Sequence, residues 1–439
     1  MRLRIGRIGF IGMIVAANAA AQTPAPAART DSGPTVTLDE AIARALAIQP
    51  TMVQAMGTER NAAAASRSAW GSFLPSLSLG GSSATNSSNR FNSQTGQIVN
   101  VPSSSSYSAS LSASFNIFEG FARTATLNAA RATADAAAAG YTSAKYQTIL
   151  AVKEAYFAVI ADQELVRVAQ AQVTVSGTQL QIAAQKLRAG AGTRSDSLAA
   201  AVTYGNNQVA LLTAQANLAG AEVSLGRQVG LNGPVQAVPD STLPAFPDTV
   251  AIRGTSLGSA PLVAAADANA RAAGSLVTVS RSQYWPTFSV SYANGFTGLE
   301  APWNSTGTYV NNWSYRFALN WTLFNGFARE QTVTSAAVSR DVAQAQAADT
   351  RRSVDASISQ QVIALAAAHT SVAISEANVA SGQEALRVAQ ERFRVGAGLL
   401  LDVQTAEANL AQAEVSLIQA RFTYRTALST LAALLGREL

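Results

Sequence analysis

The sequence predicts an α+β membrane protein built from two tandem structural repeats. Each repeat supplies a β-hairpin to an oligomeric β-barrel and a long antiparallel helical hairpin to a coiled-coil tunnel. Three observations predict this fold class. The two halves of the 439-residue chain repeat the same motifs, four segments alternate apolar and polar residues, and two long segments carry an apolar residue at every seventh position.

The first residues are typical of a secretory signal peptide. Three arginines precede a short apolar run at 8–17, and residues 19–21 form an A-x-A cleavage site, so we expect residues 1–21 to be removed. No later run reaches the roughly 20 consecutive apolar residues of a spanning helix. We therefore expect a mature chain that leaves the cytosol and has no transmembrane helix.

Charge and cysteine content exclude several classes of site. The formal net charge is +5, and removal of the three signal arginines lowers it to +2 without leaving a basic cluster, so nucleic acid is not an expected partner. The chain has no cysteine, which excludes disulfides, thiolate metal sites and a lipid anchor on cysteine.

The internal repeat defines the domain organisation. Residues 118–123 (FEGFAR) recur as 324–329 (FNGFAR) at an offset of 206, and this offset continues to the end of the chain. We expect repeat 1 at 37–230 and repeat 2 at 260–439. A linker at 22–36 precedes the first repeat, which begins at a Thr37-x-x-Glu40 capping box, and a proline-rich linker at 231–259 separates the two repeats.

Each repeat contains one predicted β-hairpin, at about 75–118 and about 286–324. The long strands, Tyr107–Phe118 and Asn312–Phe324, alternate apolar and polar residues, as lipid-facing barrel strands do. We expect shorter partner strands at Leu77–Ser83 and Thr287–Phe296, and Ser/Asn-rich outer loops at Ala84–Ser106 and Thr297–Val310.

Period-2 alternation also fits a half-buried strand of a soluble sandwich. The tryptophans favour the membrane alternative, because interfacial tryptophan belts are typical of membrane proteins. All five lie in or beside the strand regions and none in the long helices: Trp70, Trp285, Trp303, Trp313 and Trp321.

Four strands cannot close a barrel alone. An open sheet edge in lipid leaves backbone groups unsatisfied at several kcal/mol each, so the sheet must close between chains. Two chains would give eight strands and a filled interior, whereas three chains give twelve strands and a lumen. Conduction therefore favours a trimeric 12-stranded barrel with four strands per chain.

Each FxGFAR motif is followed by a predicted long helical hairpin, at about 121–230 and about 327–436. Seven-residue spacing of large apolar residues, such as Val152, Val159 and Leu180, indicates left-handed supercoiling. A continuous helix over 121–189 would be roughly 100 Å long. Periodicity fits a filled coiled coil and a hollow tube equally well, and the adjoining strands favour the tube.

These motifs resemble the TolC-type outer-membrane efflux protein family. The resemblance is carried in order by Thr37-Leu38-Asp39-Glu40-Ala41-Ile42, Leu74-Pro75, the Phe118–Arg123 motif and glycine-containing tips followed by aspartate. It implies a homotrimer in the outer membrane whose 12-helix tunnel extends into the periplasm. It also implies a periplasmic adaptor (membrane fusion) protein and an inner-membrane pump of the resistance-nodulation-division (RND), ABC or major-facilitator (MFS) type as partners. The duct would conduct substrates passively in a tripartite efflux or type I secretion system.

The resemblance also implies site residues at the helical tips. Asp196 and Asp402 match family aspartates that ring the periplasmic entrance and bind cations, whereas family gate positions are occupied here by Phe393, Gly398 and Thr405. A helix N-cap is the alternative role of both aspartates. The glycine-rich tips are candidates for adaptor contact, with a mere turn as the alternative: Arg188, Gly190, Gly192, Arg194, Arg394, Gly396 and Gly398.

The sequence predicts no enzymatic activity and no cofactor. His369 is the single histidine and lies in mid-helix, so neither a metal site nor a Ser/His/Asp triad can be assembled around it. Two non-enzymatic alternatives stay open: a trimeric outer-membrane adhesin, whose strands would form one block at the carboxyl end, and a periplasmic coiled-coil scaffold.

Overall fold

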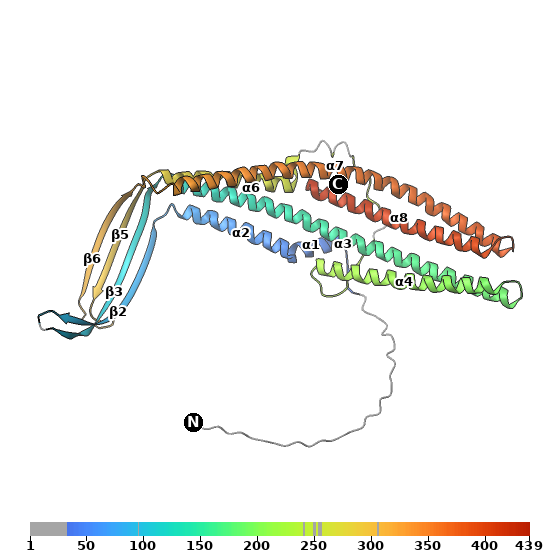
Figure 1. Cartoon of the computed structure of the whole chain (residues 1–439), viewed down its shortest axis with the longest axis horizontal. Coiled ribbons are helices and arrows are strands. Elements are labelled where there is room, and N and C mark those ends of the chain that lie inside the picture. Colours follow the sequence, from blue (N-terminus) through green and yellow to red (C-terminus); the bar gives the residue numbers. More distant parts are fainter. Residues whose placement is uncertain (1–32, 95, 240–241, 249–251, 253–256, 305–306) are drawn as a thin grey trace, which may run out of the picture.

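The computed structural model describes residues 33–94, 96–239, 242–248, 252, 257–304 and 307–439. The expected signal peptide at 1–21 and most of the expected linker at 22–36 lie outside these residues. The chain is elongated, with a β-sheet at one end and long helices running along the rest of the molecule (Figure 1).

The sheet has four antiparallel strands in the order β2-β3-β5-β6. They are β2 (Ser76–Asn92), β3 (Gln97–Glu119), β5 (Thr287–Gly298) and β6 (Tyr309–Asn320). β2 and β6 are the two edges, and each has an unpaired side within the chain. A sheet with two free edges satisfies its backbone in lipid only when it pairs with further strands.

Cross-strand register separates an apolar face from a polar face of this sheet. Leu79, Leu111, Asn294 and Trp313 form one row across the four strands, and Ser76, Ser114, Ser291 and Arg316 form another. Because side chains alternate along each strand, the two rows lie on opposite faces. The apolar face gathers exposed large side chains, such as Leu77, Leu79, Leu111, Trp313, Tyr315, Phe317 and Leu319.

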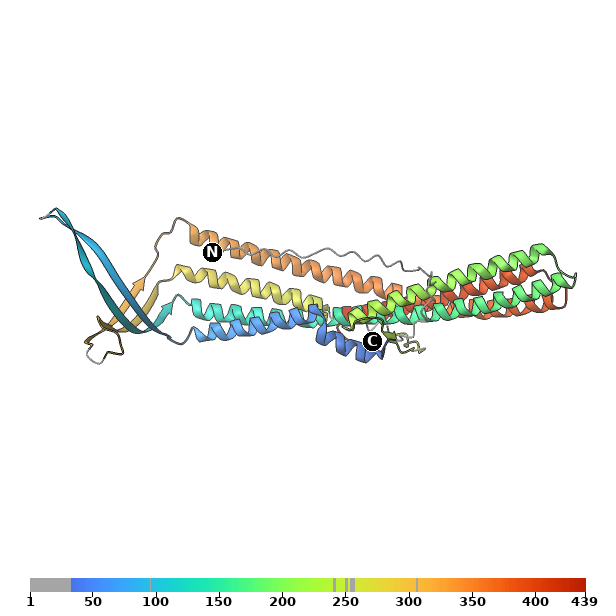
Figure 2. The same cartoon turned by 90° about the horizontal axis from the view of Figure 1, so that it is seen from below.

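The expected loop Ala84–Ser106 is wrong. β2 and β3 stay paired from Ala84 opposite Ser106 out to Asn92 opposite Gln97, with a register shift between Asn86 and Ser88. This ribbon extends beyond β5 and β6 (Figure 2). Serine and asparagine resemble loop composition, yet backbone pairing does not depend on apolar side chains when both faces of a hairpin are exposed.

The second hairpin differs less from its prediction. Residues 299–308 connect β5 to β6, inside the expected loop Thr297–Val310. The long strand begins earlier and ends earlier than expected, at Tyr309 and Asn320. The alternation continues to Phe324 in the sequence, but residues 321–324 leave the sheet before the turn at 325–327.

The helices match the predicted lengths closely. α3 (Ala122–Arg188) and α7 (Ala328–Arg394) have 67 residues each, or roughly 100 Å of continuous helix. They pair antiparallel with α4 (Arg194–Gln228) and α8 (Leu400–Leu435). The shorter α2 (Pro50–Gly71) and α6 (Pro261–Arg281) lie beside the strand-proximal halves of α3 and α7.

Heptad positions form the cores of the helical part. Val152 and Val159 are fully buried in a cluster with Leu225, and Leu365 is fully buried in a second cluster with Tyr424 and Leu431. Small residues take the facing positions: a Cβ on Gly177 would meet the Tyr204 ring at 3.2 Å. Toward the tips the heptad positions become more exposed.

The regions expected as linkers also contain ordered structure. β1 (Thr35–Val36) pairs in parallel with β4 (Gln236–Ala237), and the Tyr156 hydroxyl donates a 3.0 Å hydrogen bond to the Val238 carbonyl. Residues 234–239 are therefore packed against the helices. Thr37 is the N-cap of α1 (Leu38–Ile48), and its hydroxyl accepts a hydrogen bond from the Glu40 backbone, which is one half of the predicted capping box. The Glu40 carboxylate pairs with Arg44 at 2.7 Å.

Among the described residues, one helix, α7, is long enough and apolar enough in composition to cross a membrane. Composition alone is weak support for a span here. A 67-residue helix is over three times longer than a bilayer requires, and alanine accounts for much of its apolar content.

Candidate functional site

Two parts of the molecule could line a conduit: the tips of the helical hairpins and the polar face of the sheet. They lie at opposite ends of the long axis (Figure 2). A short junction between strand and helix connects the sheet to α3 and α7.

The first tip is a tight turn between α3 and α4. Gly190 has φ +75°, and the Ala191 amide donates to the Lys186 carbonyl at 2.9 Å. A Cβ on Gly192 would lie 3.0 Å from Lys186 Cβ, so the chain needs glycine to pass this close. Arg188 and Arg194 are exposed on either side of the turn.

The second tip, between α7 and α8, has the same geometry. Gly396 has φ +80°, the Ala397 amide donates to the Arg392 carbonyl at 2.9 Å, and a Cβ on Gly398 would lie 3.0 Å from Arg392 Cβ. Arg394 is exposed and pairs with Glu391 at 2.9 Å. The adaptor-contact residues predicted from sequence thus lie in two matching exposed turns.

Asp196 and Asp402 do not occupy the N-cap position that was their alternative role. Both are the third residue of their helices, where the carboxylate accepts a hydrogen bond from the N-cap amide, at 3.3 Å from Thr193 and 3.2 Å from Leu399. A carboxylate in the first turn also interacts favourably with the helix dipole. Asp402 is exposed and Asp196 half-buried, so both retain contact with solvent.

The two hairpins of one chain contact each other near the tips. The Lys186 ammonium lies 3.6 Å from the centroid of the Phe393 ring and donates to the Phe393 carbonyl at 3.3 Å. Ala183, Ala200 and Leu400 form a small buried cluster beside this contact. Phe393, which the resemblance placed at a gate position, is therefore held by Lys186 from the other hairpin.

The tips also expose apolar side chains that the sequence reasoning did not select. Leu198, Val395, Leu399 and Leu401 are each between 58% and 68% exposed. Their position in the sequence, within or close to the glycine turns, could have marked them as candidates for contact. Exposed apolar side chains gathered near the end of a rod are candidates for contact with another protein.

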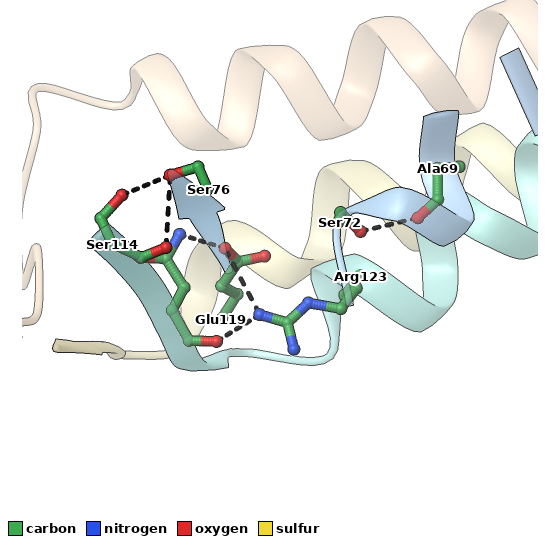
Figure 3. Close-up of polar contacts among 7 residues, drawn as sticks. Ala69, Ser72, Ser76, Ser114, Glu119 and Arg123 are labelled. Atoms are coloured by element: carbon green, nitrogen blue, oxygen red, sulfur yellow. Dashed lines mark hydrogen bonds and ion pairs between the residues drawn. The ribbon is translucent and has the colours of Figure 1, made fainter. Parts of the chain in front are cut away.

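At the sheet end, serine hydroxyls dominate the polar face of the first hairpin. Ser76 bonds Ser114 at 2.6 Å, Ser78 bonds Ser112 at 2.7 Å, and Ser82 bonds Ser108 at 2.7 Å. The close-up of the first hairpin shows Ser76 and Ser114 facing each other across the strands (Figure 3). Between Ser76 and Ser82, the polar face of this hairpin is therefore rich in hydroxyl groups and carries no charge.

The FxGFAR motifs form the junctions between strand and helix. Phe121 and Phe327 both have φ +65°, an unusual left-handed conformation for a bulky residue. Arg123 reaches back toward the strands: its guanidinium lies 4.9 Å from the Phe115 ring and donates a hydrogen bond to the Asn116 carbonyl. It also pairs with Glu119 at 3.9 Å (Figure 3).

The second junction repeats this arrangement. Arg329 lies 4.2 Å from the Tyr284 ring and donates to the Thr322 carbonyl at 3.2 Å. In both motifs the arginine stands three residues after the glycine, and its contacts couple the last strand residues to the first helical turn.

The residue types that bind metal ions are scattered over the described part of the chain. No group of three or more His, Asp or Glu side chains there could hold a metal ion. The His369 ring lies 4.8 Å from the Phe246 ring and 5.9 Å from the Tyr424 ring, so its neighbours are aromatic.

Comparison with known proteins agrees with this geometry. The family model described as "Outer membrane efflux protein" matches residues 41–231 and 253–437. The cobalt-zinc-cadmium resistance protein CzcC of Cupriavidus metallidurans is 30% identical over 171 residues, which are 38% of this chain and 41% of CzcC. The matched part therefore spans about two fifths of that relative's length.

Solved structures share the fold over most of the chain. The outer membrane protein VceC of Vibrio cholerae has a TM-score of 0.74 at 21% identity, covering 91% of this chain and 96% of VceC. The CmeC outer membrane channel of Campylobacter jejuni has a TM-score of 0.76 at 17% identity, covering 91% and 85%. Because the family model spans both halves of the sequence, the chain belongs to the outer membrane efflux protein family.

Proposed function

We propose that this protein is the outer-membrane channel of a tripartite export system, passively conducting substrates from a periplasmic adaptor and an inner-membrane pump to the exterior. The observation that carries the proposal is the four-stranded sheet, which has an apolar face, a polar face and two unpaired edges. Such a sheet satisfies its backbone in a membrane only as part of a closed barrel.

Three chains give the proposed assembly. β6 of one protomer would pair with β2 of the next, which closes a barrel of twelve strands with a lumen. The proposed tunnel continues the same ring, because each pair of adjacent strands feeds one helical hairpin through an FxGFAR junction. The proposed tandem repeat is supported by the identical length of α3 and α7 and by the matching φ angles of Phe121 and Phe327.

The helical tips are the proposed periplasmic end. In this proposal the exposed apolar residues Leu198, Val395, Leu399 and Leu401 contact the adaptor, together with the two glycine turns. Asp196 and Asp402 would place six carboxylates near one constriction in the trimer, which raises the local concentration of cations. The pump, of RND, ABC or MFS type, would supply the transport energy.

A deletion strain tests the proposed function. Loss of the protein should raise sensitivity to at least one member of a panel of dyes, antibiotics and the metals cobalt, zinc and cadmium. The metals belong in the panel because the relative CzcC is a cobalt-zinc-cadmium resistance protein. Full-length protein should restore resistance and should fractionate with the outer membrane.

A variant that lacks residues 186–194, which form the first tip, separates assembly from export. This variant should reach the outer membrane and assemble but should not restore resistance. Recovery of the protein in the soluble periplasmic fraction would contradict the channel and would favour the scaffold alternative. Unchanged sensitivity to the whole panel would contradict a role in export of these compounds.

A further inference from the structure

We propose that Arg316 forms a ring of three positive charges in the barrel lumen and gives the barrel a preference for anions. This inference rests on the trimeric channel proposed above, because a single chain supplies one arginine. It concerns the selectivity of the barrel section, which the family and the fold do not specify.

The register places Arg316 on the polar face of the sheet. It lies opposite Ser291 on β5, which lies opposite Ser114 on β3, which in turn lies opposite Ser76 on β2. Its neighbours on β6, Tyr315 and Phe317, belong to the apolar face. An arginine on a lipid face costs about 2–4 kcal/mol near the bilayer midplane, so the lumen is the favourable environment for this side chain.

Arg316 is unusually isolated from other charges. The four strands contain three charged residues in total: Arg90, Glu119 and Arg316. Glu119 is the last residue of β3 and pairs with Arg123, and Arg90 lies in the ribbon that extends beyond β5 and β6. The Arg316 side chain is exposed, and none of the ion pairs in the described part of the chain includes it.

The neighbouring protomer would not neutralise this charge. β6 is an edge strand, so in the proposed barrel Arg316 would lie beside β2 of the next protomer. The β2 residues on the same polar face are small and uncharged: Ser76, Ser78, Gly80 and Ser82. Serine and glycine supply no counter-charge and leave space for the arginine.

The dimensions of the barrel allow this ring to act on ions in transit. Twelve strands about 4.8 Å apart, tilted by about 40°, give a backbone radius of about 12 Å. The Debye length is about 10 Å at 0.1 M salt, so the potential of three arginines on the wall extends toward the axis. Rings of arginine or lysine select for anions in other pores.

Ion selectivity in planar bilayers tests the charge of the ring. We expect the chloride-to-potassium permeability ratio, taken from the reversal potential across a KCl gradient, to fall by about twofold in Arg316→Gln, as for an energy on the order of kT per ion. Arg316→Glu should lower the ratio further. Arg316→Lys keeps the charge and is the matched control, with an unchanged ratio.

Cysteine labelling tests the position of the ring independently of ion flow. The chain has no cysteine, so a charged, membrane-impermeant thiol reagent reports on introduced residues alone. Arg316→Cys should react from the aqueous phase, and its neighbour Tyr315→Cys, on the apolar face, should be protected by lipid.

The outcomes distinguish the ring from the channel itself. Currents with an unchanged reversal potential in Arg316→Gln would overturn the ring and leave the channel intact. Labelling of Tyr315→Cys with protection of Arg316→Cys would also overturn the ring. Two results together would contradict the proposed channel and the ring with it: a wild-type protein that assembles but passes no current, and protection of both Arg316→Cys and Tyr315→Cys from the reagent.

Discussion

The side-chain amide of Gln179 on α3 donates a hydrogen bond to the carboxylate of Glu407 on α8, which joins the two helical hairpins of one chain near the tips. Glu407 also lines a cavity of about 170 Å³ with Gln172, Thr203 and Asn207. Glu414, on the same helix, is the other titratable group in this cavity. Burial raises the pKa of Glu407 to about 7, although the Gln179 hydrogen bond lowers it in part.

This raised pKa predicts that the folded state becomes less stable with rising pH, because the half-buried Glu407 carboxylate must then carry a charge. The unfolded chain ionises Glu407 near pH 4.5, while the folded chain retains the proton up to about pH 7. The folded state therefore binds more protons over this window, and stability falls as pH rises from about 4.5 to 7. The full effect is at most about 3 kcal/mol, and partial exposure reduces it.

Glu407→Gln should remove this pH dependence. We expect the variant to be about 1–2 kcal/mol more stable than wild type at pH 8 and equal to it at pH 4.5, measured by urea titration in detergent. Glu438→Gln, at an 86% exposed carboxylate, is the control and should follow the wild-type profile. Parallel pH profiles for wild type and Glu407→Gln would refute the prediction.

Loss of the Lys186–Phe393 contact should favour an open entrance. Lys186→Ala removes a cation–π contact at 3.6 Å and a hydrogen bond at 3.3 Å between the two hairpins. Together these contribute about 1–2 kcal/mol, so the open fraction should rise by about five- to thirtyfold. Single-channel recording measures this fraction. Lys145→Ala, on the same helix but remote from the tip, should leave it unchanged.

The proposed cation ring predicts weaker block by multivalent cations after loss of Asp402. Asp402→Asn keeps an oxygen that can accept from the Leu399 amide but removes the charge, so its effect separates charge from turn geometry. We expect the blocking concentration of a trivalent cation to rise several-fold in single-channel recordings. If Asp402→Asn and wild type are blocked equally, the carboxylate acts as a helix-turn residue alone.

The two junction glycines should differ in their tolerance of alanine. Gly120 and Gly326 have φ +60° and +67°, so either substitution costs about 1–2 kcal/mol in backbone strain. A Cβ at 120 would also contact the Trp285 side chain and lie 2.7 Å from the Ser282 carbonyl oxygen, whereas nothing lies within 4 Å at 326. Gly120→Ala should therefore lower the melting temperature more than Gly326→Ala.

The sequence predicted the helices better than the strands, and the reason is physical. α3 begins and ends one residue inside the expected range of 121–189, because heptad spacing and glycine turns mark both ends of a long helix. The outer half of the β2–β3 ribbon was missed, because no apolar alternation marks a hairpin exposed on both faces. Residues 84–106 are rich in serine and asparagine, as loops are.

The tip contacts show a different limit. Gln179 and Glu407 are 228 residues apart, and Lys186 and Phe393 are 207 apart, so no local pattern pairs them. The sequence did mark both tips as candidate sites through their glycines and aspartates. It could not show that Phe393 is held by a lysine of the other hairpin, since that depends on how the two hairpins pack.

The β2–β3 ribbon would be exposed at the outer surface of the cell. In the proposed orientation its turn, near Asn92 and Gln97, is the part of the chain furthest from the periplasm (Figure 2). Phe91 and Ile98 are 65% and 70% exposed beside this turn. Antibodies and bacteriophages would meet this ribbon first, which makes it a natural place to graft an epitope for surface display.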